Sequence, residues 1–137
     1  MSKNKTPQMA ILDGDGTFQI EVVGESKYFD NLRKIAGSNR EDDVEVVKTA
    51  YMVPEPSNQY DPNAIRVVVD QMTVGYLPRP TAATLSPLLR QAKLAGVQVQ
   101  AEISAFEGAS NYSVQLDGDL NEIAELVQSS KPKWKFW

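Results

Sequence analysis

The residues best suited to bind or convert a ligand lie in one short stretch, Glu55–Val67, which reads Glu-Pro-Ser-Asn-Gln-Tyr-Asp-Pro-Asn-Ala-Ile-Arg-Val. Prolines in and just before this stretch restrict the backbone to extended or turn conformations. Its Ser and Asn side chains can bond to the neighbouring backbone and so favour tight turns. The sequence therefore predicts a rigid loop that directs the ring of Tyr60 and the carboxylate of Asp61 toward a common ligand.

The residue types that are missing limit the chemistry of this loop. The chain has no His and no Cys, which excludes Ser-His-Asp and Cys-His catalysis and zinc sites built on imidazole or thiolate. An enzyme would have to use scattered carboxylates such as Glu55, Asp61 and Asp70, and their spacing alone does not make a metal nuclease. We therefore expect no catalytic residue, no metal and no cofactor.

A second acidic motif, Asp13-Gly-Asp-Gly16, has the start of a calcium-loop pattern. Such a loop needs further oxygen ligands and a Glu near its end, and Thr17 and Phe18 follow here instead. We interpret the motif as a turn.

The overall charge also limits the partners. The net charge is −4 and the isoelectric point is about 4.8, which argues against a general nucleic-acid coat protein. Any anion site must therefore be a local feature. No apolar run approaches the roughly 20 residues of a membrane span, the N-terminus does not have a signal-peptide pattern, and cysteine is absent. We expect a cytoplasmic protein without membrane contact.

The hydrophobic pattern predicts the elements that must position the loop. Apolar alternation indicates strands, and apolar residues at helical spacing indicate helices. Their order favours a small, twisted, closed β-barrel, because closure removes sticky strand edges. We expect one domain over residues 17–128, a flexible N-terminus over 1–16 and a flexible tail over 129–137. The expected strands are 18–24, 44–53, 64–70, 73–77, 97–105 and 112–116, and the expected helices are 28–37, 81–95 in two pieces with Ser86 capping the second, and a C-terminal helix over 117–128 capped by Asp119.

Three parts of the chain resemble the HIRAN domain family: Val22–Tyr28, Glu55–Val67, and Val74–Arg79 followed by Ala82-Ala83. The resemblance covers roughly residues 17–117. It implies a mainly β, OB-like six-stranded barrel with two short helices, to which this chain adds the C-terminal helix. It further implies a non-enzymatic module that binds single-stranded DNA at its 3′-hydroxyl end in repair or replication. The chain is similar to the short bacterial members of the family.

The resemblance also implies roles for residues in and around the loop. Tyr60 corresponds to the aromatic that packs on the terminal nucleotide, and Asp61 to the acid that accepts a hydrogen bond from the free 3′-hydroxyl. Asn58 corresponds to an amide that lines the same pocket.

Other residues correspond to contacts along the strand. Tyr28 resembles a second stacking aromatic, and Lys27 stands at a phosphate-contacting position. Arg79 resembles a basic residue that faces the DNA backbone, Tyr112 resembles an aromatic against a base, and Tyr76 stands where DNA-binding members have a His.

The residues leave alternatives open. Asn58 and Asp61 can instead act as turn caps, and Tyr112 shares a strand face with Val114, which favours core packing equally. The basic, aromatic tail Lys131–Trp137 can dock on a protein partner. A protein-interaction module that uses the barrel pocket or this tail is therefore the alternative function.

Overall fold

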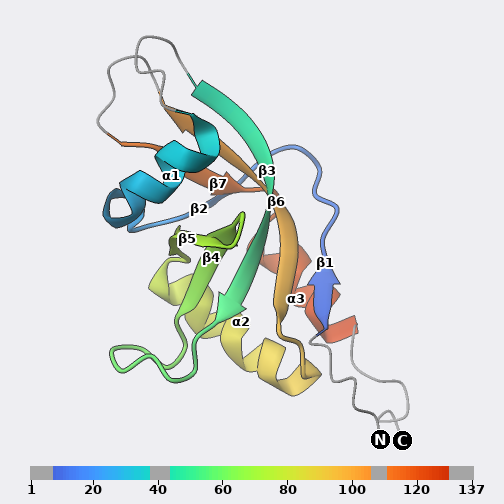
Figure 1. The fold of residues 1–137 in the computed structure, drawn as a ribbon. Coiled ribbons are helices and arrows are strands. Elements are labelled where there is room, and N and C mark those ends of the chain that lie inside the picture. The colour runs from blue at the N-terminus through green and yellow to red at the C-terminus, as the bar shows by residue number, and fades with distance from the viewer. Residues whose placement is uncertain (1–7, 38–43, 106–110, 130–137) are drawn as a thin grey trace, which may run out of the picture.

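A strongly curved antiparallel sheet forms the centre of the fold (Figure 1). The computed structural model describes residues 8–37, 44–105 and 111–129. The strand order in the sheet is β2-β7-β6-β3-β4-β5. The strands of this path are β2 (Ile20–Glu21), β3 (Val44–Pro54), β4 (Ile65–Val69), β5 (Met72–Tyr76), β6 (Gly96–Ala105) and β7 (Ser113–Leu116).

The chain just after β2 joins the two ends of this sheet. Val22 N donates a hydrogen bond of 3.0 Å to the carbonyl oxygen of Val114 in β7. One residue later, Val23 N donates to Tyr76 O at 2.8 Å, and Tyr76 N donates to Val23 O at 2.9 Å. The sheet thus curls into an OB-like barrel, as the sequence predicts.

Residue alternation explains why β3 and β6 form the longest pair of the sheet. They pair from Val44 opposite Ala105 to Met52 opposite Val97. In β6, every second residue from Val97 to Ile103 is buried, and the residues between are polar and partly exposed. One face of this pair therefore supplies the barrel core and the other faces solvent.

The described residues form three α-helices against the barrel: α1 (Phe29–Ala36), α2 (Arg79–Ala92) and α3 (Leu120–Ser129). A 3-10 turn, η1 (Glu25–Tyr28), leads into α1. The capping prediction for α3 is confirmed, because Glu122 N donates to Asp119 Oδ1 at 2.9 Å and Asp119 N donates to Glu122 Oε1 at 3.1 Å. This reciprocal pair is a capping box.

The two-piece prediction for the second helix is wrong, because α2 runs unbroken through Pro87. Pro87 removes the hydrogen bond to the carbonyl of Ala83, and Ala83 is exposed, so water can replace the missing donor. Ser86 is buried inside the helix and does not cap one.

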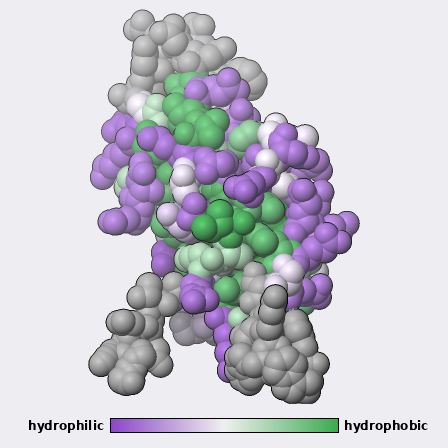
Figure 2. Space-filling view, turned by 90° about the vertical axis from the view of Figure 1, so that its right-hand side faces the viewer, coloured by the Kyte–Doolittle hydropathy of each residue, from purple (hydrophilic) through white to green (hydrophobic). Residues whose placement is uncertain are grey.

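A parallel strand, β1 (Met9–Ile11), lies beside β6 within the segment for which the sequence predicts a flexible N-terminus. Its three residues are too few to show a periodic pattern. Ile11 exposes 58% of its surface, and the face that carries β1 has a hydrophobic area bordered by hydrophilic residues (Figure 2). Residues 1–7 and the tail from 130 lie outside the described residues.

The first predicted strand, 18–24, is shortened to Ile20–Glu21. It starts late because Phe18 has a left-handed backbone, with φ 47°, and it ends early because Val23 pairs with Tyr76 instead of β7. The buried carboxylate of Asp117 accepts hydrogen bonds from Gly16 N at 3.0 Å and Phe18 N at 3.2 Å. The motif Asp13–Gly16 therefore lies in a loop with a bend at Gly16, and Asp117 holds this loop. Asp117 precedes α3, which begins at Leu120 and not at residue 117. Among the described residues, no helix is long and apolar enough to cross a membrane.

Candidate functional site

A pocket of about 460 Å³ opens where the loop after β3, the turn η1 and the first residues of α2 meet. This volume lies within the range of about 300–1,000 Å³ that is usual for small-ligand sites. Apolar residues, among them Val23 and Leu77, form part of its lining. The pocket brings together seven of the eight site residues predicted from the sequence: Lys27, Tyr28, Asn58, Tyr60, Asp61, Tyr76 and Arg79.

The loop is held in shape by its own side chains. Asn58 Oδ1 accepts hydrogen bonds from Tyr60 N at 2.9 Å and from Asp61 N at 3.0 Å. Asp61 Oδ1 accepts one from Asn63 N at 2.9 Å. Both side chains therefore cap turns, one of the two alternatives, and they also line the pocket. Tyr60 is left 82% exposed at the rim of the pocket.

Glu55 connects this loop to strand β5. Its Oε1 accepts a hydrogen bond of 2.9 Å from the hydroxyl of Tyr76 and one of 3.0 Å from Asn58 Nδ2. Its Oε2 lies 3.5 Å from Arg66 Nε. Burial, and then the hydrogen bond to Glu55, raises the pKa of Tyr76. Tyr76 therefore remains a neutral donor at physiological pH, and Glu55 fixes its ring against the pocket.

Sequence reasoning did not assign this role to Glu55, which we considered only as a scattered carboxylate. The sequence feature that points to this role is the position of Glu55 as the first residue of the Glu55–Val67 motif. It lies 21 residues before Tyr76 in the chain, and only the pairing of β3 with β4 and of β4 with β5 brings the two together.

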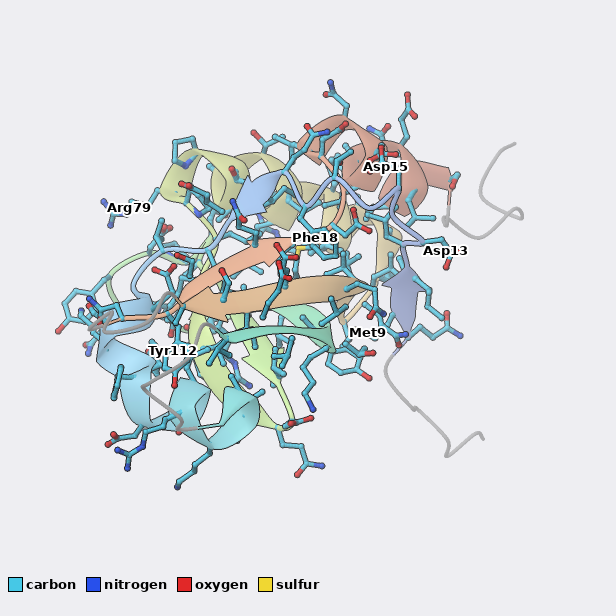
Figure 3. All side chains as sticks on the ribbon, turned by 90° about the horizontal axis from the view of Figure 1, so that it is seen from above. Met9, Asp13, Asp15, Phe18, Arg79 and Tyr112 are labelled. Atoms are coloured by element: carbon cyan, nitrogen blue, oxygen red, sulfur yellow. The ribbon has the colours of Figure 1, made fainter. Side chains whose placement is uncertain are left out.

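The side chains that line the pocket carry one more positive charge than negative charge. Arg79 Nε lies 3.6 Å from Asp61 Oδ2, and Arg79 Nη2 donates to Tyr60 O at 3.4 Å. The Arg79 side chain is 77% exposed and projects away from the body of the protein (Figure 3). Lys27 is exposed at the last turn of η1. Two cations and one carboxylate thus line the pocket, on a protein whose net charge is −4.

Two tyrosines contribute aromatic surface opposite the loop. The rings of Tyr28 and Tyr76 are 6.4 Å apart and inclined at 43°. Tyr28 is the last residue of η1, which follows β2 in the chain, and Tyr76 is the last residue of β5. The pocket therefore spans the seam at which the barrel closes.

Tyr112 does not reach this pocket. Only 6% of its surface is exposed, its hydroxyl donates to Gly37 O at 2.9 Å, and its ring centre lies 5.5 Å from that of Phe29 (Figure 3). The structure thus corresponds to the core-packing alternative for Tyr112. A ring enclosed in this way has no open face for a base, so we leave Tyr112 out of the candidate site.

Replacing Tyr112 by Phe tests this assignment. The change keeps the ring and removes only the hydrogen bond to Gly37. We expect the free energy of unfolding to fall by about 0.5–1.5 kcal/mol, measured by urea denaturation, with ligand affinity unchanged. A loss of oligonucleotide affinity without a loss of stability would contradict the core role.

Comparison with known proteins identifies the family. The family model of the HIRAN domain matches residues 15–117, about three quarters of the chain. The chain belongs to the HIRAN domain family. Membership of this family implies a module that binds single-stranded DNA. No curated protein matches the chain.

One solved structure that the chain resembles is the HIRAN domain of human HLTF. The two are 16% identical, and the similarity covers 65% of this chain and 88% of that one, with a TM-score of 0.32. In the part of the chain that the structure describes, no group of three or more acidic side chains is suited to hold a metal ion.

Proposed function

We propose that the pocket of this HIRAN domain binds the terminal nucleotide of a single DNA strand that ends in a 3′-hydroxyl, without catalysis, in repair or replication. The observation that carries the proposal is the carboxylate of Asp61, which is positioned by a capped turn beside the exposed ring of Tyr60. An acid in a DNA site requires a special reason, because it repels phosphate.

The 3′-hydroxyl supplies that reason. A carboxylate accepts a hydrogen bond from a hydroxyl, and such charge-assisted bonds are among the stronger ones. Asp61 Oδ1 already accepts from Asn63 N, and Oδ2 makes only a long contact of 3.6 Å with Arg79 Nε, so we assign the hydroxyl to Oδ2. An internal 3′ position carries a phosphate ester, which has no proton to donate and adds negative charge. A chain end is therefore favoured over a strand interior.

The aromatic side chains support stacking of the terminal base. Alanine substitutions in other proteins show that stacking contributes about 1–3 kcal/mol per base, with little sequence preference. Tyr60 offers an open ring at the rim, and Tyr28 offers a second ring across the pocket. The volume of about 460 Å³ suits one terminal nucleotide.

Lys27 and Arg79 are the candidate phosphate contacts. Arg79 is held near Asp61 and Tyr60 O by long contacts of 3.6 Å and 3.4 Å, so a phosphate can recruit it at small cost. With two phosphate contacts on a single strand, the logarithm of the binding constant should fall with the logarithm of salt concentration at a slope of about −1.4.

The proposal is tested with short fluorescent oligonucleotides that differ only at the 3′ end. We expect the 3′-hydroxyl strand to bind more tightly than the 3′-phosphate strand in fluorescence anisotropy titrations. A labelled strand with a 5′-hydroxyl and a blocked 3′ end serves as the control. Equal affinity for the two 3′ ends would contradict end recognition, and no binding to either strand at low salt would favour the alternative of a protein-interaction module.

A further inference from the structure

A second groove, of about 650 Å³, lies outside the proposed DNA site, between β2 and the first residues of α2 and α3. It shares no lining residue with the pocket that contains Tyr60 and Asp61. Its apolar lining includes a partly exposed aromatic ring, Phe18, whose left-handed backbone is held by Asp117. The side chains used below are Phe18, Ile20, Glu21, Pro78, Asp119 and Leu120.

The charge of this groove is negative. Glu21 is exposed on one side and Asp119 lies on the other, at the N-terminus of α3. Asp119 is fixed there because its Oδ1 caps Glu122 N. No Lys or Arg is found among the described residues that line the groove. Such a surface repels phosphate and suits a ligand that combines cations with apolar rings.

The chain itself carries a segment of that chemistry directly after α3. The sequence Lys131-Pro-Lys-Trp-Lys-Phe-Trp137 has three lysines and three large aromatic residues and no acidic side chain. Large aromatic residues are costly to leave in water without a contact surface. The groove and the segment are thus complementary in both charge and apolar character.

The length of the segment allows it to reach the groove. Helix α3 has ten residues and is therefore about 15 Å long. The groove lies at its N-terminal end, and residues 130–137 follow its C-terminal end. Eight extended residues span at most about 26 Å, so a segment that turns back along α3 covers the distance with its last residues over the groove.

We propose that the segment 131–137 runs back along α3 and that its end docks in this groove of the same chain. The aromatic rings at the end of the segment would cover Phe18 and Leu120, and a lysine between them would lie near Glu21 and Asp119. The segment would then cover the apolar surface between β2 and α3. The proposal does not depend on DNA binding, and its test uses no DNA.

The two tryptophans of the chain, Trp134 and Trp137, both belong to this segment, so intrinsic tryptophan fluorescence of the full chain reports on its docking. We expect a blue-shifted emission maximum and weaker acrylamide quenching in the native protein than in the urea-unfolded protein. Glu21→Lys should shift the emission back toward the unfolded value. Glu45→Lys, which reverses an exposed charge on β3 outside the groove, should leave the emission unchanged.

Replacing the three tail lysines by Gln keeps the described barrel residues intact and should also remove the blue shift, which covers the case in which Glu21→Lys fails to fold. Native emission identical to that of the unfolded chain would overturn the proposal. A blue shift that survives both changes would overturn it too, because the rings would then be buried elsewhere. A shift that depends on protein concentration would assign the tail to a second copy and equally overturn it.

Discussion

Asp61→Asn is expected to weaken binding of a 3′-hydroxyl strand by about 10- to 100-fold, since a hydrogen bond to a charged group contributes about 1.5–3 kcal/mol. The substituted side chain can still accept from Asn63 N through Oδ1, so the turn is preserved. Its second terminal atom becomes an NH₂ donor and no longer accepts the hydroxyl proton. Anisotropy titrations with both 3′ ends measure the effect.

The affinity for a 3′-phosphate strand should stay the same or increase in this variant, because a negative charge has been removed. Asp70→Asn is the matched control. It removes the same charge from an exposed turn between β4 and β5, at a left-handed position that Asn tolerates. If Asp61→Asn binds the 3′-hydroxyl strand as tightly as Asp70→Asn does, the carboxylate makes no specific contact with the hydroxyl, and the role of Asp61 is refuted.

Gly75→Ala is expected to lower the free energy of unfolding by about 2–5 kcal/mol, because backbone strain at positive φ adds to overpacking. Gly75 has φ 157°, and an added Cβ would collide with Val22 Cγ1 and lie 2.8 Å from Val23 O. That carbonyl accepts the hydrogen bond from Tyr76 N that helps to close the barrel. Urea denaturation followed by circular dichroism measures the loss.

Gly16→Ala separates the two causes. Gly16 also has a positive φ, 86°, but nothing lies within 4 Å of an added Cβ. Its replacement should therefore cost only about 1–2 kcal/mol, the backbone strain alone. Equal destabilisation by the two changes would show that close packing at the seam contributes nothing.

The barrel strands were predictable where their pattern is long. Alternation over β6 and the Val-rich run of β3 extend over ten residues or more, so periodicity identifies both. The parallel strand β1 has three residues and depends on its pairing with Gly96–Gln98, which local sequence does not encode. Phe18 fits the alternating pattern, yet its backbone is left-handed and its N–H is bound by the distant carboxylate of Asp117.

The candidate site was predictable for a different reason. Its loop residues are adjacent in sequence, and the prolines and Asn58 shape them locally, so Tyr60 and Asp61 fall together at the pocket. Tyr112 could not be resolved in this way, because exposed and buried tyrosines at strand ends have the same local pattern. The packing of Phe29 from α1 and the hydrogen bond to Gly37, both distant in sequence, contribute to its burial.

The seam between Val23 and Tyr76 has a consequence for how ligand binding and folding are coupled. The pocket takes Lys27 and Tyr28 from one edge of the sheet, Tyr76 from the other, and Asp61 from the loop between β3 and β4. A ligand that contacts all of these acts as an additional cross-link between the two edges. Because such a ligand binds only the folded chain, it raises the free energy of unfolding by about 2.7 kcal/mol at a ligand concentration 100 times the dissociation constant. Ligand binding therefore stabilises the closed barrel against unfolding.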